Sequence, residues 1–126
     1  MAEIHAIKLT QDEAVVKIYK TDANGGVVDL DLSTDIKLDS ETFNRAQANV
    51  AIAEIFWGAK KDKQIDISRI DDPVANTVHG HYYLINTGSY NFDGFVDNVY
   101  GNSDIRITAD GPFHVLLKLR KTSGYA

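Results

Sequence analysis

The sequence contains no cysteine and only two prolines among its 126 residues. Without cysteine, neither a disulfide nor a thiolate metal site can form, so the fold must rest on packing. There is also no long hydrophobic run: the longest mostly apolar segment, residues 49–59, is far shorter than the roughly 20 residues of a membrane-spanning helix. Residues 1–5 show no basic stretch followed by an apolar run, as a secretory signal would. We therefore expect a soluble protein made in the cytoplasm.

The composition is that of one ordinary globular domain. Hydrophobic residues make up 44% of the chain and charged residues 25%, which is enough to build a core without metals. We expect a single domain over residues 1–121, followed by an exposed tail over residues 122–126. The net charge of -5 disfavours binding to the backbone of nucleic acids. Neither a nucleic acid nor a membrane is therefore an expected partner.

The hydrophobic pattern has a period of two residues rather than 3.6. In residues 28–32, for example, valine and leucine alternate with aspartate, which is typical of a strand with one buried face. Comparable segments recur about every 8–12 residues. They predict strands over residues 4–9, 15–20, 28–32, 50–57, 65–70, 77–86, 105–107 and 113–121, and an irregular stretch over 90–100. The sequence therefore predicts an all-β, single-domain antiparallel β-sandwich, jelly-roll-like, of about 8–10 short strands.

Local details of this prediction concern turns and strand faces. The Asn-Gly-Gly segment at 24–26 tolerates positive φ and predicts a hairpin between the second and third strands. Residues 88–89, Gly-Ser, are expected to close the strand over 77–86. Residues 50–57 are apolar at most even-numbered and all odd-numbered positions, which predicts a central strand covered on both sides. Residues 39–47 predict a loop or one short helical turn.

Residue types used in catalysis form no recognisable motif. No serine lies in a Gly-x-Ser-x-Gly elbow, so we identify no nucleophile with its base and acid. With 18 acidic residues, a carboxylate pair at glycosidase spacing arises by chance. The Gly25-Gly26 pair precedes no predicted helix and therefore does not indicate a phosphate-binding loop. We predict a protein that is not an enzyme and has no catalytic residue and no cofactor.

Two groups of residues invite a metal hypothesis. His79 and His81 are two residues apart and share one side of a regular strand, where a third ligand would complete a zinc or copper site. The interpretation we favour places them on a solvent face or a subunit interface, where their protonation would make assembly sensitive to pH. Asp29, Asp31 and Asp35 suggest calcium, but the first two alternate with apolar residues and are expected on a wet face. We predict no metal site.

Among the residue types of this chain, the aromatic residues give the most information about function. Six of them fall between positions 82 and 100, namely Tyr82, Tyr83, Tyr90, Phe92, Phe95 and Tyr100. Tyr82 and Tyr83 are adjacent, so one is expected to face the core and the other the solvent. Exposed aromatic side chains are favoured at protein interfaces and at sugar-stacking platforms. In the last strand, Lys118, Arg120 and Lys121 form a cationic group that protects an edge or complements an acidic neighbour.

Segments spread over most of the chain resemble small virion structural proteins of tailed bacteriophages, particularly marine and cyanobacterial phages. The matching segments are IHAIKLT at 4–10, IFWGA at 55–59, IDISR at 65–69, SDIRIT at 103–108 and LLKLRKTSGY at 116–125. The resemblance implies a β-sandwich that works as a capsid decoration or cement protein. A head–tail or tail accessory protein is the nearest alternative. The resemblance assigns no functional residue, because none of these segments carries chemistry.

The resemblance further implies a partner and a location. The protein would bind the shell of the major capsid protein, stabilise the head, and lie on the capsid surface of the virion after assembly in the host cytoplasm. Self-association as a dimer or trimer is typical of symmetric assemblies. Our candidate contact residues come from the first strand, the aromatic stretch and the C-terminal segment: Ile4, His5, His79, His81, Tyr82, Tyr83, Tyr90, Phe92, Phe95, Arg120 and Tyr125.

Two hypotheses from other classes remain open at this point. A carbohydrate-binding β-sandwich would use Tyr82, Tyr83, Tyr90 or Phe92 as a platform on which sugar rings stack. A small β-sandwich enzyme would depend on a metal held by the two histidines at 79 and 81. Binding to purified capsids would distinguish a virion protein from a carbohydrate-binding protein. Loss of hydrolysis when both histidines are replaced would support the enzyme hypothesis.

Overall fold

The computed structural model describes the chain apart from residues 1, 71–77 and 93–95. The described residues form nine strands and one short 3-10 turn, η1 (Arg45–Gln47), which lies in the segment predicted to hold a loop or helical turn. The strands are β1 (Ala2–Leu9), β2 (Glu13–Lys20), β3 (Gly26–Leu30), β4 (Asn49–Ala59), β5 (Gln64–Ile70), β6 (Val78–Ile85), β7 (Thr87–Asn91), β8 (Asp104–Ala109) and β9 (Phe113–Ser123).

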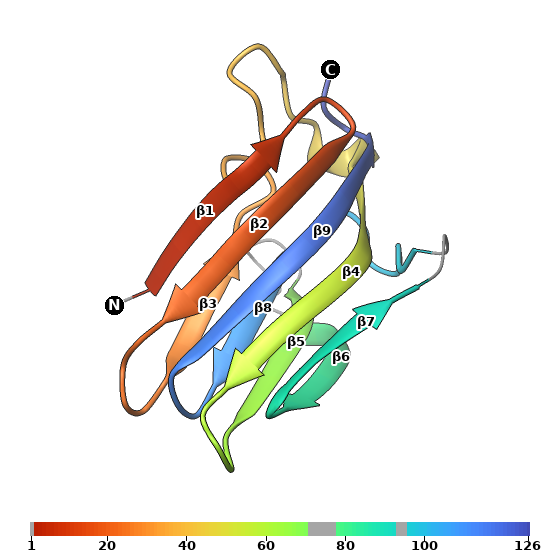
Figure 1. Ribbon diagram of the computed structural model, residues 1–126. Coiled ribbons are helices and arrows are strands. Elements are labelled where there is room, and N and C mark those ends of the chain that lie inside the picture. Colours follow the sequence, from red (N-terminus) through yellow and green to blue (C-terminus); the bar gives the residue numbers. More distant parts are fainter. Residues whose placement is uncertain (1, 71–77, 93–95) are drawn as a thin grey trace.

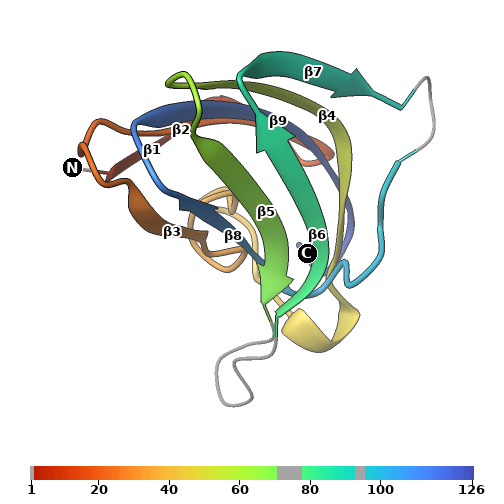
Figure 2. The ribbon, with the colours of Figure 1, turned by 90° about the horizontal axis from the view of Figure 1, so that it is seen from below.

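The strands form two antiparallel sheets with the connectivity of a jelly roll. Sheet A has the order β1-β2-β9-β4-β7 and sheet B the order β3-β8-β5-β6. The pairs β2–β9, β3–β8, β4–β7 and β5–β6 are nested inside one another, as in one long hairpin rolled up on itself. Sheet A lies in front of sheet B in Figure 1, and Figure 2 shows the two layers from below. The predicted all-β, jelly-roll-like sandwich is confirmed.

Alternation along the strands fills the space between the two sheets. In β9, Val115, Leu117 and Leu119 are fully buried, whereas His114 and Arg120 are exposed. The same period-two pattern runs through β2 and β8. Burying one such aliphatic side chain contributes about 1.5–3 kcal/mol, so the shared core can hold a chain that has no disulfide.

The predicted hairpin at residues 24–26 is wrong, although its turn chemistry is right. Gly25 and Gly26 both have positive φ, at 67° and 138°. The turn nevertheless connects β2 in sheet A with β3 in sheet B, and β3 forms its hydrogen bonds with β8. A hairpin and a crossing between sheets both require residues that tolerate positive φ, so local sequence does not distinguish them.

The prediction that residues 50–57 are covered on both sides is wrong at Phe56, and the reason is a β-bulge in β4. The register of β4 against β9 shifts between Ile52 and Glu54. One extra residue reverses the alternation, so Ile52 before the bulge and Ile55 after it both pack in the core. Phe56 consequently faces outward and is 44% exposed. The strand looks apolar on both faces in sequence because the bulge moves the core positions from even to odd numbers.

The strand over residues 77–86 was also predicted to close at the wrong place. The chain turns at Asn86, which has a φ of 57°, and Gly88 and Ser89 lie inside β7. A Cβ atom at Gly88 would lie 2.6 Å from Cζ2 of Trp57. The glycine therefore allows the indole ring to pack closely against β7, and it does not form the turn.

The expectation of an exposed tail over 122–126 is wrong at Tyr125, which is buried, whereas Thr122, Ser123 and Ala126 are exposed as expected. Strand β9 continues to Ser123, and Tyr125 is only 8% exposed. The Tyr125 hydroxyl donates a hydrogen bond to the carbonyl of Leu32 at 2.7 Å, and its ring centroid lies 5.0 Å from that of Phe43. A large aromatic side chain that reaches the core fixes the end of the described chain.

Candidate functional site

Three of the aromatic residues that we predict as contact residues form a cluster between the edge strands β6 and β7. The ring of Tyr90 lies 5.1 Å from Trp57, and the ring of Tyr82 lies 6.2 Å from Tyr90 and 6.3 Å from Phe92. The Tyr82 hydroxyl donates a hydrogen bond to the carboxylate of Asp97. Burial and this bond both raise the pKa of Tyr82, so the hydroxyl remains a donor. The rings pack on one another and close this side of the core, and Tyr90 keeps part of its surface exposed.

Tyr83 belongs to a different surface. Tyr82 pairs across the strands with the buried Ile67, whereas Tyr83 pairs with Asp66 on the outer face of sheet B. The prediction that the two tyrosines face opposite sides is therefore confirmed. Ile85, two residues further along β6, shares the outer face with Tyr83, and the two side chains are 63% and 64% exposed respectively. We call these two side chains the Tyr83–Ile85 patch.

The histidine pair is only partly described. The ring of His79 stacks on that of Tyr100, with centroids 3.9 Å apart and an interplanar angle of 12°. The side chain of His81, like Phe95, lies outside the described residues. Within the described part of the chain, no group of three His, Asp or Glu residues converges as metal ligands would. Asp29 lies on the wet face of β3, as predicted, where its carboxylate accepts two hydrogen bonds from Arg106 at 2.8 and 3.0 Å.

The candidate contact residues of the first strand differ in their surroundings. Ile4 is half-buried and packs against the core. His5 is exposed, and its Nε2 lies 3.1 Å from a carboxylate oxygen of Glu3. The register of β1 shifts between Ala6 and Lys8, which places a bulge on this edge of sheet A. A bulge on an edge strand opposes the addition of a further strand from another molecule.

The predicted cationic group of the last strand does not form one surface. Lys121 is fully buried and binds the carboxylate of Glu41 at 2.7 Å. Arg120 and Lys118 do lie on the outer face of sheet A, but each has an acidic residue directly opposite in the register, Glu13 for Arg120 and Glu54 for Lys118. The expectation of a cluster of three surface cations is therefore wrong, because Lys121 faces inward.

A cleft on the outer face of sheet A was not predicted from the sequence. Its volume is about 580 Å³, within the range of small-ligand sites. Its centre is one row of residues in register across four strands: Tyr19 on β2, His114 on β9, Gly58 on β4 and Thr87 on β7. These residues are up to 95 positions apart in the chain, so only the strand register, which local sequence does not provide, brings them together.

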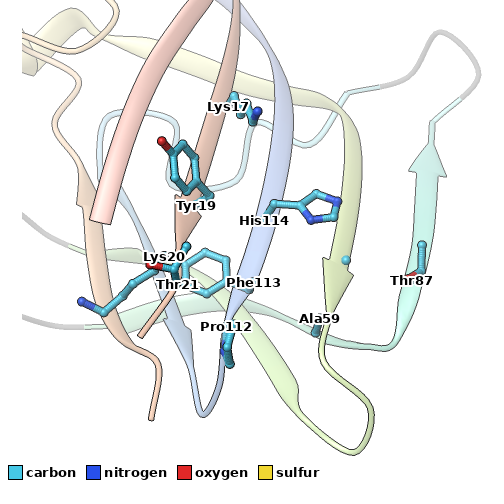
Figure 3. Close-up of a pocket in the computed structure, with 10 residues that line it drawn as sticks. Lys17, Tyr19, Lys20, Thr21, Ala59, Thr87, Pro112, Phe113 and His114 are labelled. Carbon is cyan, nitrogen blue, oxygen red and sulfur yellow. The ribbon is translucent and has the colours of Figure 1, made fainter. Parts of the chain in front are cut away.

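The two rings of this row lean in opposite directions. Figure 3 shows the Tyr19 ring directed toward β1 and the His114 ring directed toward β4. The Tyr19 hydroxyl donates a hydrogen bond to Glu3 on β1, which holds its ring there. A Cβ at Gly58 would lie 2.2 Å from Cε1 of His114, so the imidazole can lie over β4 only because residue 58 is glycine. The cleft opens between the two rings, and the backbone at Phe113 lies beneath it.

Comparison with protein-family models finds no family that matches this sequence, and comparison with curated proteins finds no similar one. Among the described residues, no helix has the length and apolar character needed to cross a membrane. The candidate site therefore rests on the fold and on the surfaces described above.

Proposed function

We propose that the protein is a non-enzymatic virion structural protein, namely a capsid decoration or cement protein that binds the shell of the major capsid protein and stabilises the head. The segments that resemble virion proteins of tailed phages support this role. The fold is compatible with it, since jelly rolls form viral capsid domains as well as lectins and cupins. Fold alone does not assign a function, so the surface of the protein must distinguish among these roles.

The observation that carries the proposal is the Tyr83–Ile85 patch. Two large apolar side chains, each more than 60% exposed, lie on the same face of an edge strand. Polar residues oppose them in the register, Asp66 beside Tyr83 and Gln64 beside Ile85. An apolar centre with a polar rim is the anatomy of a protein contact surface. Tyrosine is also among the residues that most often dominate the binding energy of such contacts.

A small contact suits a protein that is present in many copies on a symmetric shell. Each copy would bury little surface, but copies that also contact one another bind the shell with an avidity that exceeds the single affinity. Arg69 connects β5 to β4 and to the segment that precedes β8. It is buried on β5 and donates hydrogen bonds to the carbonyl groups of Val50, Gly101 and Ser103.

The test is co-sedimentation with heads that lack the protein, purified from the phage that encodes it. We expect saturable binding of the wild type. The variant Tyr83→Ser/Ile85→Ser should bind at least about thirtyfold more weakly, as expected for the loss of a dominant contact. Val27→Ser is the matched control, because Val27 is an exposed apolar residue on the opposite edge strand of sheet B, and it should bind like the wild type.

Three outcomes would contradict the proposal or the contact surface that it assigns. Binding of the wild type to neither heads nor tails would remove the virion role. Binding to purified tails but not to heads would replace the decoration role with that of a tail accessory protein. Equal weakening by the control and the double variant would show that the contact lies elsewhere.

A further inference from the structure

We propose that the cleft between Tyr19 and His114 is a binding site for an anionic saccharide, such as a uronic acid residue of a polysaccharide. The cleft lies on sheet A, whereas the Tyr83–Ile85 patch lies on sheet B. This inference is therefore independent of the proposed virion role, and either can fail without the other.

The walls of the cleft suit a sugar ring. The rings of Tyr19 and His114 diverge from adjacent positions on β2 and β9, and since the Tyr19 ring stacks on His5 at a centroid distance of 6.0 Å, the opposite face of Tyr19 is the one that a sugar would contact. Aromatic faces pack well against the apolar C–H face of a sugar, and a tyrosine can do so at low entropic cost because it has few rotatable bonds. The hydroxyl groups of Thr21 and Thr87 lie on the rim as donors and acceptors for sugar hydroxyls.

The charge of the cleft selects an anion. Lys17 is exposed, and its Nζ lies 5.4 Å from the centroid of the Tyr19 ring. It forms no salt bridge with any residue that the structure describes. The other lysine that lines the cleft, Lys20, is already bound to Asp22 at 2.9 Å. Lys17 thus offers an ammonium group beside an aromatic wall, in a chain whose net charge is -5.

Other cations on the same face have different neighbours. Lys118 and Arg120 stand directly opposite the acidic residues Glu54 and Glu13 in the register, whereas Lys17 stands opposite His5 and Leu116. None of the cleft residues is acidic. A carboxylate on a bound sugar would therefore find its counter-charge at Lys17, with His114 across the cleft as a second donor.

Gly58 provides a direct way to move the His114 ring without replacing any polar side chain of the cleft. Alanine at this position would force the His114 ring to move, because the added Cβ would lie 2.2 Å from Cε1. His114 is exposed, so its ring has solvent to move into, and the fold should be retained. The displaced ring would no longer form its wall of the cleft.

The experiment is an NMR titration of the whole protein, labelled with nitrogen-15, with galacturonate trisaccharide. The neutral probe is galactose trisaccharide, and the charge-only probe is a hexapeptide of glutamate. We expect the galacturonate probe to shift the amide signals of Lys17, Tyr19 and Thr21. Binding should weaken as salt is added, because the contact with Lys17 is electrostatic.

The variants sharpen this test. Lys17→Gln should weaken galacturonate binding about tenfold or more, as expected for the loss of a charged hydrogen bond. Gly58→Ala should weaken it to a similar extent. Lys118→Gln removes a cation that lies on the same sheet face but does not line the cleft, and it should have less than a twofold effect. The amide spectrum of each variant reports that it is folded.

Three results would overturn the inference. Equal binding of the neutral trisaccharide would remove the role of charge. Equal binding of the glutamate peptide at the same amide signals would assign the cleft to acidic protein segments and not to saccharides. No shift at Lys17, Tyr19 and Thr21 with any probe at millimolar concentration would mean that the cleft does not bind this class of ligand.

Discussion

Replacing Lys121 by methionine should destabilise the protein far more than the same change at Lys118, three residues earlier on β9. The Lys121 side chain is 0% exposed, and its Nζ donates hydrogen bonds to the Glu41 carboxylate at 2.7 Å and to the Thr10 carbonyl at 3.0 Å. The ammonium group also lies 4.5 Å from the centroid of the Tyr125 ring. Methionine fills a similar volume but removes the charge, so the substitution tests the ion pair and not a cavity.

The magnitude follows from what remains behind. After Lys121→Met, the buried Glu41 carboxylate keeps only the hydrogen bond from the Leu38 N–H at 2.9 Å. Breaking a buried pair from one side costs about 3–5 kcal/mol, because an uncompensated charge stays in the interior. Lys118→Met removes a surface charge and should cost at most about 1 kcal/mol. Since a domain of this size has a free energy of unfolding of about 5–15 kcal/mol, the difference is large.

The assay is urea denaturation at pH 7 and 25 °C. The double variant Lys121→Met/Glu41→Leu should recover part of the loss, because it removes both charges together. Burial raises the pKa of the Glu41 carboxyl, but the hydrogen bonds from Lys121 and Leu38 outweigh it and hold the pKa below 4.5. This contribution to stability is therefore present above pH 4.5 and is lost as the pH falls through the pKa of the folded state. Equal losses for Lys121→Met and Lys118→Met would refute the buried ion pair.

Further predictions concern the core, the C-terminal end and the acidic groups. Arg69→Met should cost about 3–5 kcal/mol in urea denaturation, since three buried carbonyl groups each lose a charged donor; a loss below about 1 kcal/mol would contradict the burial of Arg69. Tyr125→Ala should cost about 3–5 kcal/mol, whereas an exposed tail would show almost no change. Deletion of Ala53 removes the bulge and keeps Val50, Ile52 and Ile55 in the core, so it should cost little stability; deletion of Ala51 can also remove the bulge but places Ala53 in the core instead of Ile52, which should cost about 2–5 kcal/mol more in urea denaturation. Burial raises the pKa of Asp35 above 3.8, so its ionised form opposes folding at neutral pH; Asp35→Asn should raise stability at pH 7 by at most about 1 kcal/mol, and the gain should vanish below pH 3.8.

The β-sandwich could be predicted because the sequence pattern that indicates it is local and recurs along the chain. Alternation such as that of Val115, Leu117 and Leu119 assigns each strand a buried face, and the regular spacing of turns indicates a two-layer β fold. The jelly-roll pairing is a non-local property. Residues 24–26 have the chemistry of a hairpin turn, but the choice between a hairpin and a crossing is made by β8, which is about 80 residues away.

The wrong predictions have a common physical origin, because each concerns a residue type that occurs in more than one structural setting. The bulge at Ala53 exchanges the two faces of β4, and an alanine side chain does not indicate a bulge. Gly88 provides room for Trp57, although glycine is usually found in turns. Tyr125 docks in the core, although the Ser-Gly before it resembles the start of a flexible tail. Each outcome depends on a partner that lies far away in the sequence.

The candidate surfaces could be predicted only in part for the same reason. The opposite orientation of Tyr82 and Tyr83 follows from the alternation of a strand, and it is confirmed. The exposure of Ile85 and the position of Lys118 opposite Glu54 depend on the register. The cleft depends on four strands being in register at one row, so no local pattern indicates it.

The most direct test of the virion role is the position of the protein in the purified particle, determined by cryo-electron microscopy together with mass spectrometry of its components. Our account predicts many copies at symmetric positions on the outside of the head, with Tyr83 and Ile85 facing the shell. Absence of the protein from purified particles would contradict the account, as would a position in which both of these side chains face solvent.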